Sequence, residues 1–275
     1  MKIDNTRPAQ PHVGLRQADV VYIEQVESGL TRIAAVYSSA LPPVVGPIRS
    51  ARITDIALFA QYGRPAFAYS GAQSKLKPAL RAAPFFDVSQ DTGGRGYYRD
   101  RGRYAPYNLM GRPTVLLARA PRASTARDVG FVFATTAPAG GRAATKMRAA
   151  WPSSSAGFAW SPSRNAYRVS LNGRSARAAE GGGQYAKTVV VQYVKERDSG
   201  YGDKFGGRTP LSITTGTGSG VVLRNGKAWP ITWTRPSLAA GTRFQGPDGQ
   251  PLPFDVGQVW VLLVDKKSPV SFRRS

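Results

Sequence analysis

Hairpin-type turns constrain the fold of this chain more than any other feature of its sequence. Asn-Gly or Asp-Gly pairs stand at 172–173, 225–226 and 248–249, and these residues tolerate the positive φ of tight hairpins. Short runs rich in β-branched and aromatic residues lie between the turns. The strands expected from those runs are 158–161, 167–171, 188–194, 211–217, 221–224, 229–233 and 259–264. The second half is therefore predicted to be mainly antiparallel, as a sandwich or a barrel.

The first half carries helix signals as well as strand signals. Residues 19–39 are typical of a β-hairpin that turns at Glu27-Ser28-Gly29. Ser50 is expected to be the N-cap of a helix that ends near Gly63, because apolar residues recur between them at helical spacing. The further elements expected are a strand at 65–69, a short helix through Leu76 and Leu80, and a helix at 114–119. The fold class is thus predicted to be α+β, with a mixed first module and a β-rich second module.

The composition of residues 134–156 predicts a linker, because Ala, Pro, Gly and Ser dominate this stretch. The linker separates an N-terminal α+β module at 1–133, which holds the candidate site, from a β-rich C-terminal module at 157–268. Residues 269–275 are expected to form a basic tail. No repeat is visible, so we expect two modules of different design.

The charge of the chain is strongly positive, with 38 Lys and Arg against 16 Asp and Glu and a net charge of +22. Arg supplies 28 of the cations, and its guanidinium group binds carboxylate and phosphate oxygens in pairs. Nucleic acid, anionic wall polymer and anionic lipid headgroups are all admissible partners. The codon usage of a GC-rich gene is an equally good explanation of the surplus. No basic run exceeds three residues, so a tail-like nucleic-acid arm is not expected.

The first candidate site is the arginine pair Arg49 and Arg52. At a helix that begins near Ser50, the two side chains lie one turn apart beside unpaired backbone N–H groups. This arrangement suits a phosphate, sulfate or carboxylate. The alternative is that both arginines pair internally with Glu24 or Glu27 of the preceding hairpin.

The second candidate site is a stretch of interleaved Tyr and Arg at 97–108. Such residues stack on a sugar or base face while guanidinium groups hold anionic oxygens. The candidates in this stretch are Tyr98, Arg99, Arg103, Tyr104, Tyr107 and Asn108. Asp100 is flanked by Arg on both sides, so we expect it to be ionised and to orient a neighbour. The alternative is a solvated loop whose aromatic rings pack beneath it.

Four acidic side chains are candidates for glycosidase chemistry, which needs two carboxyl groups about 5–10 Å apart in one cleft. They are Glu24, Glu27, Asp55 and Asp100. His12 lies in an exposed-looking, Pro-flanked segment and is expected to have an ordinary role, although it is the single His. The absence of Cys excludes thiol catalysis and Cys-ligated zinc. No metal site and no cofactor are expected, and the Gly-rich stretch 216–220 is interpreted as a turn or bulge.

The order of several motifs resembles that of a known family. In the first half the motifs are 2–5, 17–22, 26–32, Gly46-Pro47-Ile48-Arg49-Ser50-Ala51-Arg52, 98–100 and 105–109. In the second half they are 218–220, 224–227, 231–233, 242–244, 248–249, Pro253 and 257–260. The chain is similar to the YerB-like family of bacterial proteins, described as lipoproteins and built of an N-terminal and a C-terminal domain of unknown function.

The resemblance implies a protein that faces the cell envelope, exported and often lipid-anchored through a leader. The chain shows no signal peptide, because Met1 is followed by a polar stretch, and no apolar run long enough to span a bilayer. The family supplies no established activity. The resemblance also implies His where Tyr107 stands and near Tyr69, and a phenol cannot replace imidazole in acid–base work near neutral pH. Catalysis is therefore less expected here than binding.

These observations favour an extracytoplasmic protein that binds an anionic or glycan component of the envelope. The ligand-binding residues expected are Arg49, Arg52, Tyr69, Tyr98, Arg99, Arg103, Tyr104, Tyr107 and Asn108. The alternative is a carbohydrate-active enzyme that uses the four carboxylates. A third hypothesis is a nucleic-acid-binding protein, which the net charge motivates.

Overall fold

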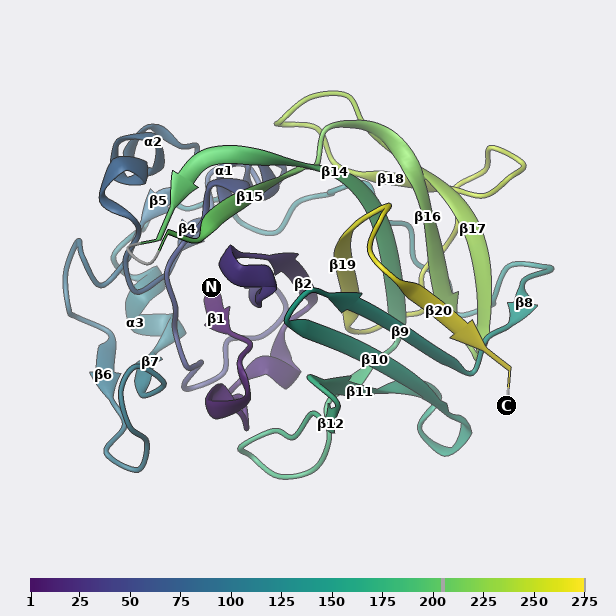
Figure 1. Ribbon diagram of the computed structural model, residues 1–275, viewed down its shortest axis with the longest axis horizontal. Helices are drawn as coiled ribbons and strands as arrows, with labels where there is room; N and C mark the ends of the chain where they lie inside the picture. The colour runs from purple at the N-terminus through teal and green to yellow at the C-terminus, as the bar shows by residue number, and fades with distance from the viewer. Residues whose placement is uncertain (204–205, 275) are drawn as a thin grey trace.

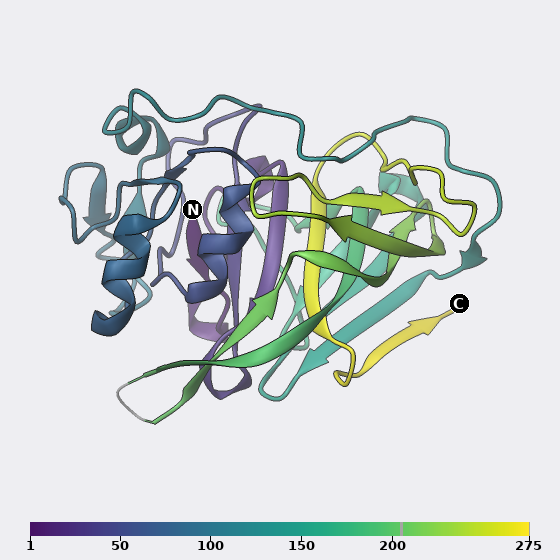
Figure 2. The same ribbon diagram turned by 90° about the horizontal axis from the view of Figure 1, so that it is seen from above.

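The computed structural model describes residues 1–203 and 206–274, which form two open β-sheets packed face to face (Figure 1). The α-helices all belong to the first half of the chain and lie to one side of the larger sheet (Figure 2). The protein is therefore β-rich, as the turns and short strands predicted. A closed barrel is not formed by the described residues, because both sheets have free edges.

The larger sheet has ten strands drawn from both halves of the sequence. Along the sheet they are β1 (Lys2–Asp4), β3 (Thr31–Val36), β2 (Val20–Gln25), β19 (Val259–Asp265), β14 (Thr188–Gly202), β16 (Gly216–Arg224), β17 (Lys227–Arg235) and β18 (Arg243–Gln245). Outside this path, β15 (Arg208–Ile213) pairs with β14, and β8 (Arg142–Ala143) pairs with β17. The predicted hairpin at 19–39 is confirmed as β2 and β3, joined through the 3-10 turn η3 (Glu27–Gly29).

The centre of the larger sheet is parallel, which the sequence did not predict. β19 runs parallel to β2 on one side and to β14 on the other. Six of its seven residues are buried, and a run without alternation is typical of a strand covered on both faces. Most other pairs are antiparallel, as expected. The two halves of the chain thus meet in one continuous sheet at β2 and β19.

The smaller sheet has six strands and packs on one face of the larger sheet. Its strands are β12 (Arg174–Ser175), β11 (Ala166–Leu171), β10 (Ser154–Ser161), β9 (Lys146–Trp151) and β20 (Val270–Arg273), and β13 (Tyr185–Ala186) pairs with β11. Alternate side chains of β9 enter the core between the sheets: Met147, Ala149 and Trp151. Across this core, the rings of Phe158 and Trp260 meet edge to face at 5.7 Å.

Several predicted boundaries were wrong. The predicted linker at 134–156 contains β8, β9 and the start of β10, because its Ala-rich composition conceals the alternation that buries Met147 and Trp151. The predicted tail at 269–275 contains β20, which pairs with β9. The stretch 211–217 belongs to two strands, β15 and β16. The predicted turn at 216–220 is strand, where the missing side chain of Gly218 leaves room for the Trp233 ring.

The other face of the larger sheet is covered by a helical layer. Its elements are α1 (Ile53–Ala60), α2 (Lys77–Ala82), α3 (Pro113–Leu117), the paired strands β4 (Ala66–Phe67) and β5 (Phe86–Asp87), and the paired strands β6 (Tyr97–Arg99) and β7 (Leu109–Gly111). Isolated 3-10 turns are η1 (Arg7–Ala9), η2 (Leu15–Gln17), η4 (Ser74–Leu76) and η5 (Pro162–Arg164). The predicted helices are confirmed, but the N-cap of α1 is Arg52 and not Ser50. The Asp55 carboxylate accepts the Arg52 backbone N–H at 2.6 Å, which fixes the start of the helix there.

The end of the β14–β15 hairpin extends past α1 as a long arm (Figure 2). The Ser212 N–H donates to Thr54 Oγ1 at 3.1 Å, so the arm is tied to the first turns of the helix. This contact brings a second-half strand to the place where the charged residues of the first half gather.

Candidate functional site

Strand register places four charged side chains on one face of the larger sheet. Asp4 of β1 and Glu24 of β2 both stand opposite Arg32 of β3, and Lys2 is two residues before Asp4. Because residues directly opposite and those two apart share a face, all four lie on the side of the helical layer. At this end of the sheet, charged side chains occupy the face that is apolar elsewhere.

The segment that enters α1 covers these four residues with further charges. The Arg49 N–H donates to the Lys2 carbonyl at 2.9 Å, so the segment runs beside β1 and leads into the first turn of the helix. We call the resulting set the ionic cluster. Its members are Lys2, Asp4, Glu24, Glu27, Arg32, Arg49, Arg52 and Asp55.

The inner part of the ionic cluster is sealed from solvent. Lys2 Nζ forms ion pairs with Glu24 and with Asp55, the latter at 2.7 Å, and all three side chains are fully buried. Burial, with the neighbouring Asp55 carboxylate, raises the pKa of Glu24 to about 7. The single cation of Lys2 thus pairs with two carboxylates, and one Glu24 oxygen has no hydrogen-bond partner in the described part of the chain.

The outer part of the ionic cluster reaches the surface. Arg52 donates to Glu27 Oε2 through Nη2 at 2.6 Å and Nε at 2.9 Å, and Thr209 of β15 donates to the other Glu27 oxygen. Arg49 Nε donates to Asp4 Oδ2 at 2.6 Å. Burial alone would raise the pKa of Asp4 and of Glu27. The pKa of Asp4 is nevertheless lowered by hydrogen bonds from Thr6 and then from Arg49. The pKa of Glu27 is lowered by Arg52 and Thr209. The predicted alternative, internal pairing, is therefore confirmed for Arg52 with Glu27.

Arg32 is one of the residues of this site that were missing from the predicted set. Its Nη1 donates to the Ser50 carbonyl at 2.9 Å, and its side chain is partly buried. Burial, followed by repulsion from Arg52, lowers its pKa to about 9. The signal that could have found it is its position three residues after the hairpin turn, opposite Glu24 and on the same face.

The Tyr–Arg stretch contributes two aromatic rings next to the ionic cluster. The Arg49 guanidinium lies 5.9 Å from the centre of the Tyr107 ring. Tyr104 meets Tyr107 edge to face at 6.0 Å and is 72% exposed. Part of the predicted convergence of the two candidate sites therefore exists, as a row formed by Arg49, Tyr107 and Tyr104.

The other predicted residues of this stretch are held by contacts within the chain. Arg103 donates to the backbone carbonyls of Ala9 and Pro11, at 3.2 and 2.7 Å, and lies 3.5 Å from Asp100. Arg99 donates to Asn108 Oδ1 at 2.7 Å. The Tyr98 ring packs under the guanidinium of Arg112, at 4.7 Å. These contacts use the side chains to fix the loop.

The predicted catalytic carboxylates do not form an open pair. Glu24 and Asp55 meet at Lys2 but are fully buried, and Glu27 is neutralised by Arg52. Asp100 lies apart from them in the β6–β7 loop. The geometry therefore gives no support to a glycosidase reaction at these residues.

His12 was expected to be exposed and is fully buried. Its Nε2 lies 2.8 Å from the Asp4 carbonyl oxygen, and burial lowers the pKa of the imidazole. Its position is that of a core side chain that helps to hold the segment carrying Asp4.

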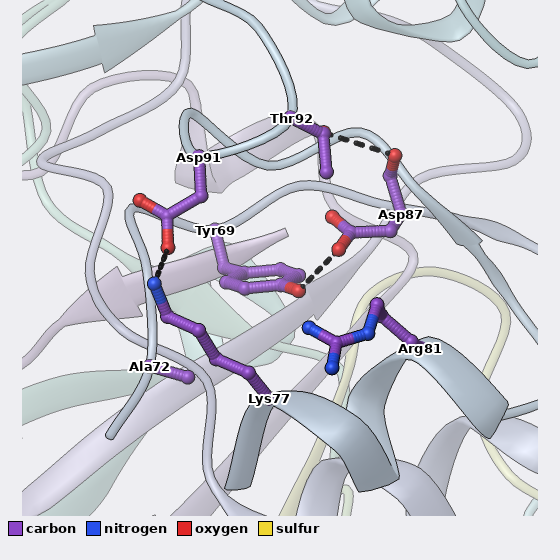
Figure 3. Close-up of a pocket in the computed structure, with 7 residues that line it drawn as sticks. All are labelled: Tyr69, Ala72, Lys77, Arg81, Asp87, Asp91 and Thr92. Atoms are coloured by element: carbon purple, nitrogen blue, oxygen red, sulfur yellow. Dashed lines mark hydrogen bonds and ion pairs between the residues drawn. The ribbon is translucent and has the colours of Figure 1, made fainter. Parts of the chain in front are cut away.

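Tyr69 lies outside the ionic cluster and lines a separate pocket (Figure 3). The pocket has a volume of about 190 Å³. Its lining residues are Tyr69, Ala72, Lys77, Arg81, Asp87, Asp91 and Thr92. Only Tyr69 among these was a predicted site residue, because isolated charges in short loops carry no spacing that a sequence reveals.

Among residues 1–203 and 206–274, no group of three or more His, Asp or Glu side chains is arranged to hold a metal ion. In the same residues, no helix is both long enough and apolar enough to cross a membrane.

The fold and the site define a β-rich protein of two packed sheets, with an ionic cluster between the first hairpin and the first helix. The "Crystal structure of YerB protein from Bacillus subtilis" has the same fold, with a TM-score of 0.81 over 98% of this chain and 92% of that chain, at 20% sequence identity. The "Putative lipoprotein YerB" of Bacillus subtilis (strain 168) is 42% identical over 50 residues, which are 18% of this chain and 15% of that protein.

Two family models match successive parts of the chain. Residues 1–126 match the "Protein of unknown function (DUF3048) N-terminal domain", and residues 146–261 match the C-terminal domain of the same family. Together they cover most of the sequence. The chain belongs to the DUF3048 family, and the family resemblance seen in its motifs is confirmed.

Proposed function

We propose that this protein is extracytoplasmic and binds an anionic glycan of the cell envelope. The anionic groups of the ligand contact Arg32 and Arg49, and its sugar rings stack on Tyr107 and Tyr104. The extracytoplasmic location is supported by the relative that carries the name of a lipoprotein. The binding role is supported by the geometry of the ionic cluster.

The observation that carries the proposal is an excess of hydrogen-bond donors in the outer part of the cluster. A guanidinium group has five N–H donors. Among the described residues, the Arg32 side chain donates one hydrogen bond and the Arg49 side chain one. The two carboxylates nearby are already occupied: Glu27 by Arg52 and Thr209, and Asp4 by Arg49 and Thr6. A carboxylate, sulfate or phosphate of a ligand would accept hydrogen bonds from the remaining N–H groups of Arg32 and Arg49.

Two features favour a glycan polymer over a small anion. Tyr104 is 72% exposed and stands edge to face with Tyr107, so both rings extend the site away from Arg49. Aromatic rings stack against the apolar faces of sugars, as they do against nucleic-acid bases. The net charge of +22 also attracts polyanions from a distance, and this attraction weakens with salt.

The test is co-sedimentation of the protein with a purified anionic wall polysaccharide at low and moderate salt. We expect Arg32→Gln/Arg49→Gln to bind at least about a hundredfold more weakly, because two hydrogen bonds to charged groups are removed and each contributes about 1.5–3 kcal/mol. Tyr104→Ala is expected to weaken binding to a smaller extent. Arg49→Gln alone is measured beside its matched control Arg148→Gln, which removes the same single charge from an exposed position of β9 in the smaller sheet.

Equal retention of wild type and the double variant would overturn the proposal. So would tighter binding of a DNA duplex than of the polysaccharide under the same conditions, which would favour the nucleic-acid hypothesis. Loss of binding in Arg148→Gln as large as in Arg49→Gln would show that net charge alone holds the polymer.

A further inference from the structure

The pocket around Tyr69 is built by different elements from those of the ionic cluster. Tyr69 follows β4, Asp87 ends β5, Lys77 and Arg81 belong to α2, and Asp91 lies in the loop after β5 (Figure 3). The proposed glycan site uses none of these residues. What the pocket binds is therefore a separate question.

The floor of the pocket is a fixed acceptor. The Tyr69 hydroxyl donates to Asp87 Oδ2 at 2.7 Å, and the Ser89 N–H donates to Asp87 Oδ1 at 2.9 Å. Burial of the ring, with the adjacent Asp87 carboxylate, raises the pKa of Tyr69. The phenol therefore stays protonated and acts as a donor. Each carboxylate oxygen of Asp87 accepts one hydrogen bond from the chain and can accept another from a ligand in the pocket.

The rim of the pocket carries charged side chains that can exchange their present partners for a ligand. Lys77 Nζ pairs with Asp91 Oδ2 at 2.8 Å, but both side chains are more than two-fifths exposed, at 44% and 43%. An ion pair this exposed contributes little stability and is readily replaced. Arg81 is exposed and has no hydrogen bond or ion pair with any residue that the structure describes. Figure 3 shows its guanidinium group beside Tyr69 and Asp87.

The lining is electrically balanced although the chain as a whole is strongly basic. Two carboxylates, Asp87 and Asp91, stand against two cations, Lys77 and Arg81. A polyanion gains nothing from such a site, and a cation meets two like charges. A ligand with one positive and one negative group a few ångströms apart can pair with the two carboxylates and with the two cations at once. The volume of about 190 Å³ is below that of pockets for drug-sized molecules and suits a ligand of few atoms.

We propose that this pocket binds a small zwitterion, of the class of a free α-amino acid. The carboxylate of the ligand is held by the guanidinium of Arg81, with Lys77 beside it. The ammonium group donates to Asp87 and Asp91, and the Thr92 hydroxyl lies at the same rim. Ala72 leaves space for a short side chain.

The test is isothermal titration calorimetry of the whole protein at pH 7 with L-alanine, N-acetyl-L-alanine and L-alanine amide. We expect saturable binding of L-alanine and at least tenfold weaker binding of both capped forms, each of which lacks one of the two charges. Arg81→Gln and Asp91→Asn are each expected to weaken L-alanine binding at least tenfold. Both residues are at the surface, so the variants are expected to fold.

Two controls separate this site from the proposed glycan site. Arg95→Gln removes an exposed arginine outside the lining, and Arg32→Gln/Arg49→Gln alters the ionic cluster; both are expected to bind L-alanine as wild type does. Absence of any saturable heat with L-alanine, glycine and L-serine would overturn the inference. Equal binding of the N-acetylated form would also overturn it and would show a simple anion site. Either result would leave the glycan proposal to its own test.

Discussion

The face of the larger sheet that lies under the helical layer has two halves of opposite character. Over β14, β16 and β19 this face presents apolar side chains such as Val190, Val222 and Leu263. At one end of β1, β2 and β3 the same face presents Lys2, Asp4, Glu24 and Arg32, and the rest of this face on β2 and β3 continues the apolar half. The backbone is the same continuous ladder in both halves, so the difference lies in the side chains alone.

The comparison shows how a β-rich protein can bury charge beside an apolar core. In the apolar half each side chain is stabilised by removal from water, without regard to direction. In the charged half each group needs a partner at hydrogen-bond distance, because a buried charge without one is costly. The inner charges meet this need within the chain through Lys2, except at one oxygen of Glu24. The outer arginines exceed it, and this excess is the feature that we connect with binding.

The largest expected effect is that of Lys2→Met, which removes the one cation between Glu24 and Asp55. We expect a loss of about 3–5 kcal/mol in the free energy of unfolding, because two buried carboxylates would remain without a counter-ion. Val190→Ala, in the apolar half, is expected to cost about 2 kcal/mol. Urea denaturation at pH 7 measures both values. A smaller loss for Lys2→Met than for Val190→Ala would break the comparison.

The next effect is a pH dependence to which the charged half contributes through Glu24. The pKa of Glu24 is raised from 4.5 to about 7 on folding, so between these values the folded state binds more protons than the unfolded state. Stability therefore falls as pH rises from about 5 to 8, by about 1–3 kcal/mol. Glu24→Gln is expected to reduce this slope, as measured by urea denaturation across that range.

Glu196 contributes to the same pH dependence, because burial raises its pKa to about 7 as well. Glu196→Gln is therefore the matched control, and it is expected to remove its own share of the slope. If the slope of Glu24→Gln equals that of wild type, the ionic cluster does not carry the effect.

The smallest expected effect separates the two arginines in the outer part of the ionic cluster, Arg49 and Arg52. Arg49→Gln is expected to change stability by less than about 1 kcal/mol, because its side chain is 26% exposed and Asp4 keeps its contacts with Thr6. Arg52→Gln is expected to lower stability more, since Glu27 is buried and would then have no cation beside it. Thermal unfolding of the two variants side by side is the measurement. Equal losses would contradict this distinction between Arg49 and Arg52.

Local features of the fold were predictable from the sequence. The φ values of Asn172 and Asn225 are 53° and 51°, as the Asn-Gly turns require. The first hairpin and the short helices were also predicted at nearly their observed positions. Each of these elements depends on residues a few positions apart, whose conformational preferences are present in any context.

The site was predictable only in part. Arg49 and Arg52 were found because they stand together in the chain, and pairing of Arg52 with Glu27 was foreseen as an alternative. Arg32 and Lys2 were missed, because their partners are defined by strand register and not by spacing. The pocket at Tyr69 was missed for the same reason, since its charges come from α2, β5 and the loop after β5.

The sequence by itself determined the Asn-Gly turns, the first hairpin, most of the central strands, and the family to which the chain belongs. Only the tertiary structure decided that β2 and β19, more than two hundred residues apart, lie parallel at the centre of one sheet. It also decided which charges are neutralised and which keep free donors. The reason is that turn and strand preferences act over a few bonds, whereas strand pairing and ion pairing depend on the packing of the whole chain.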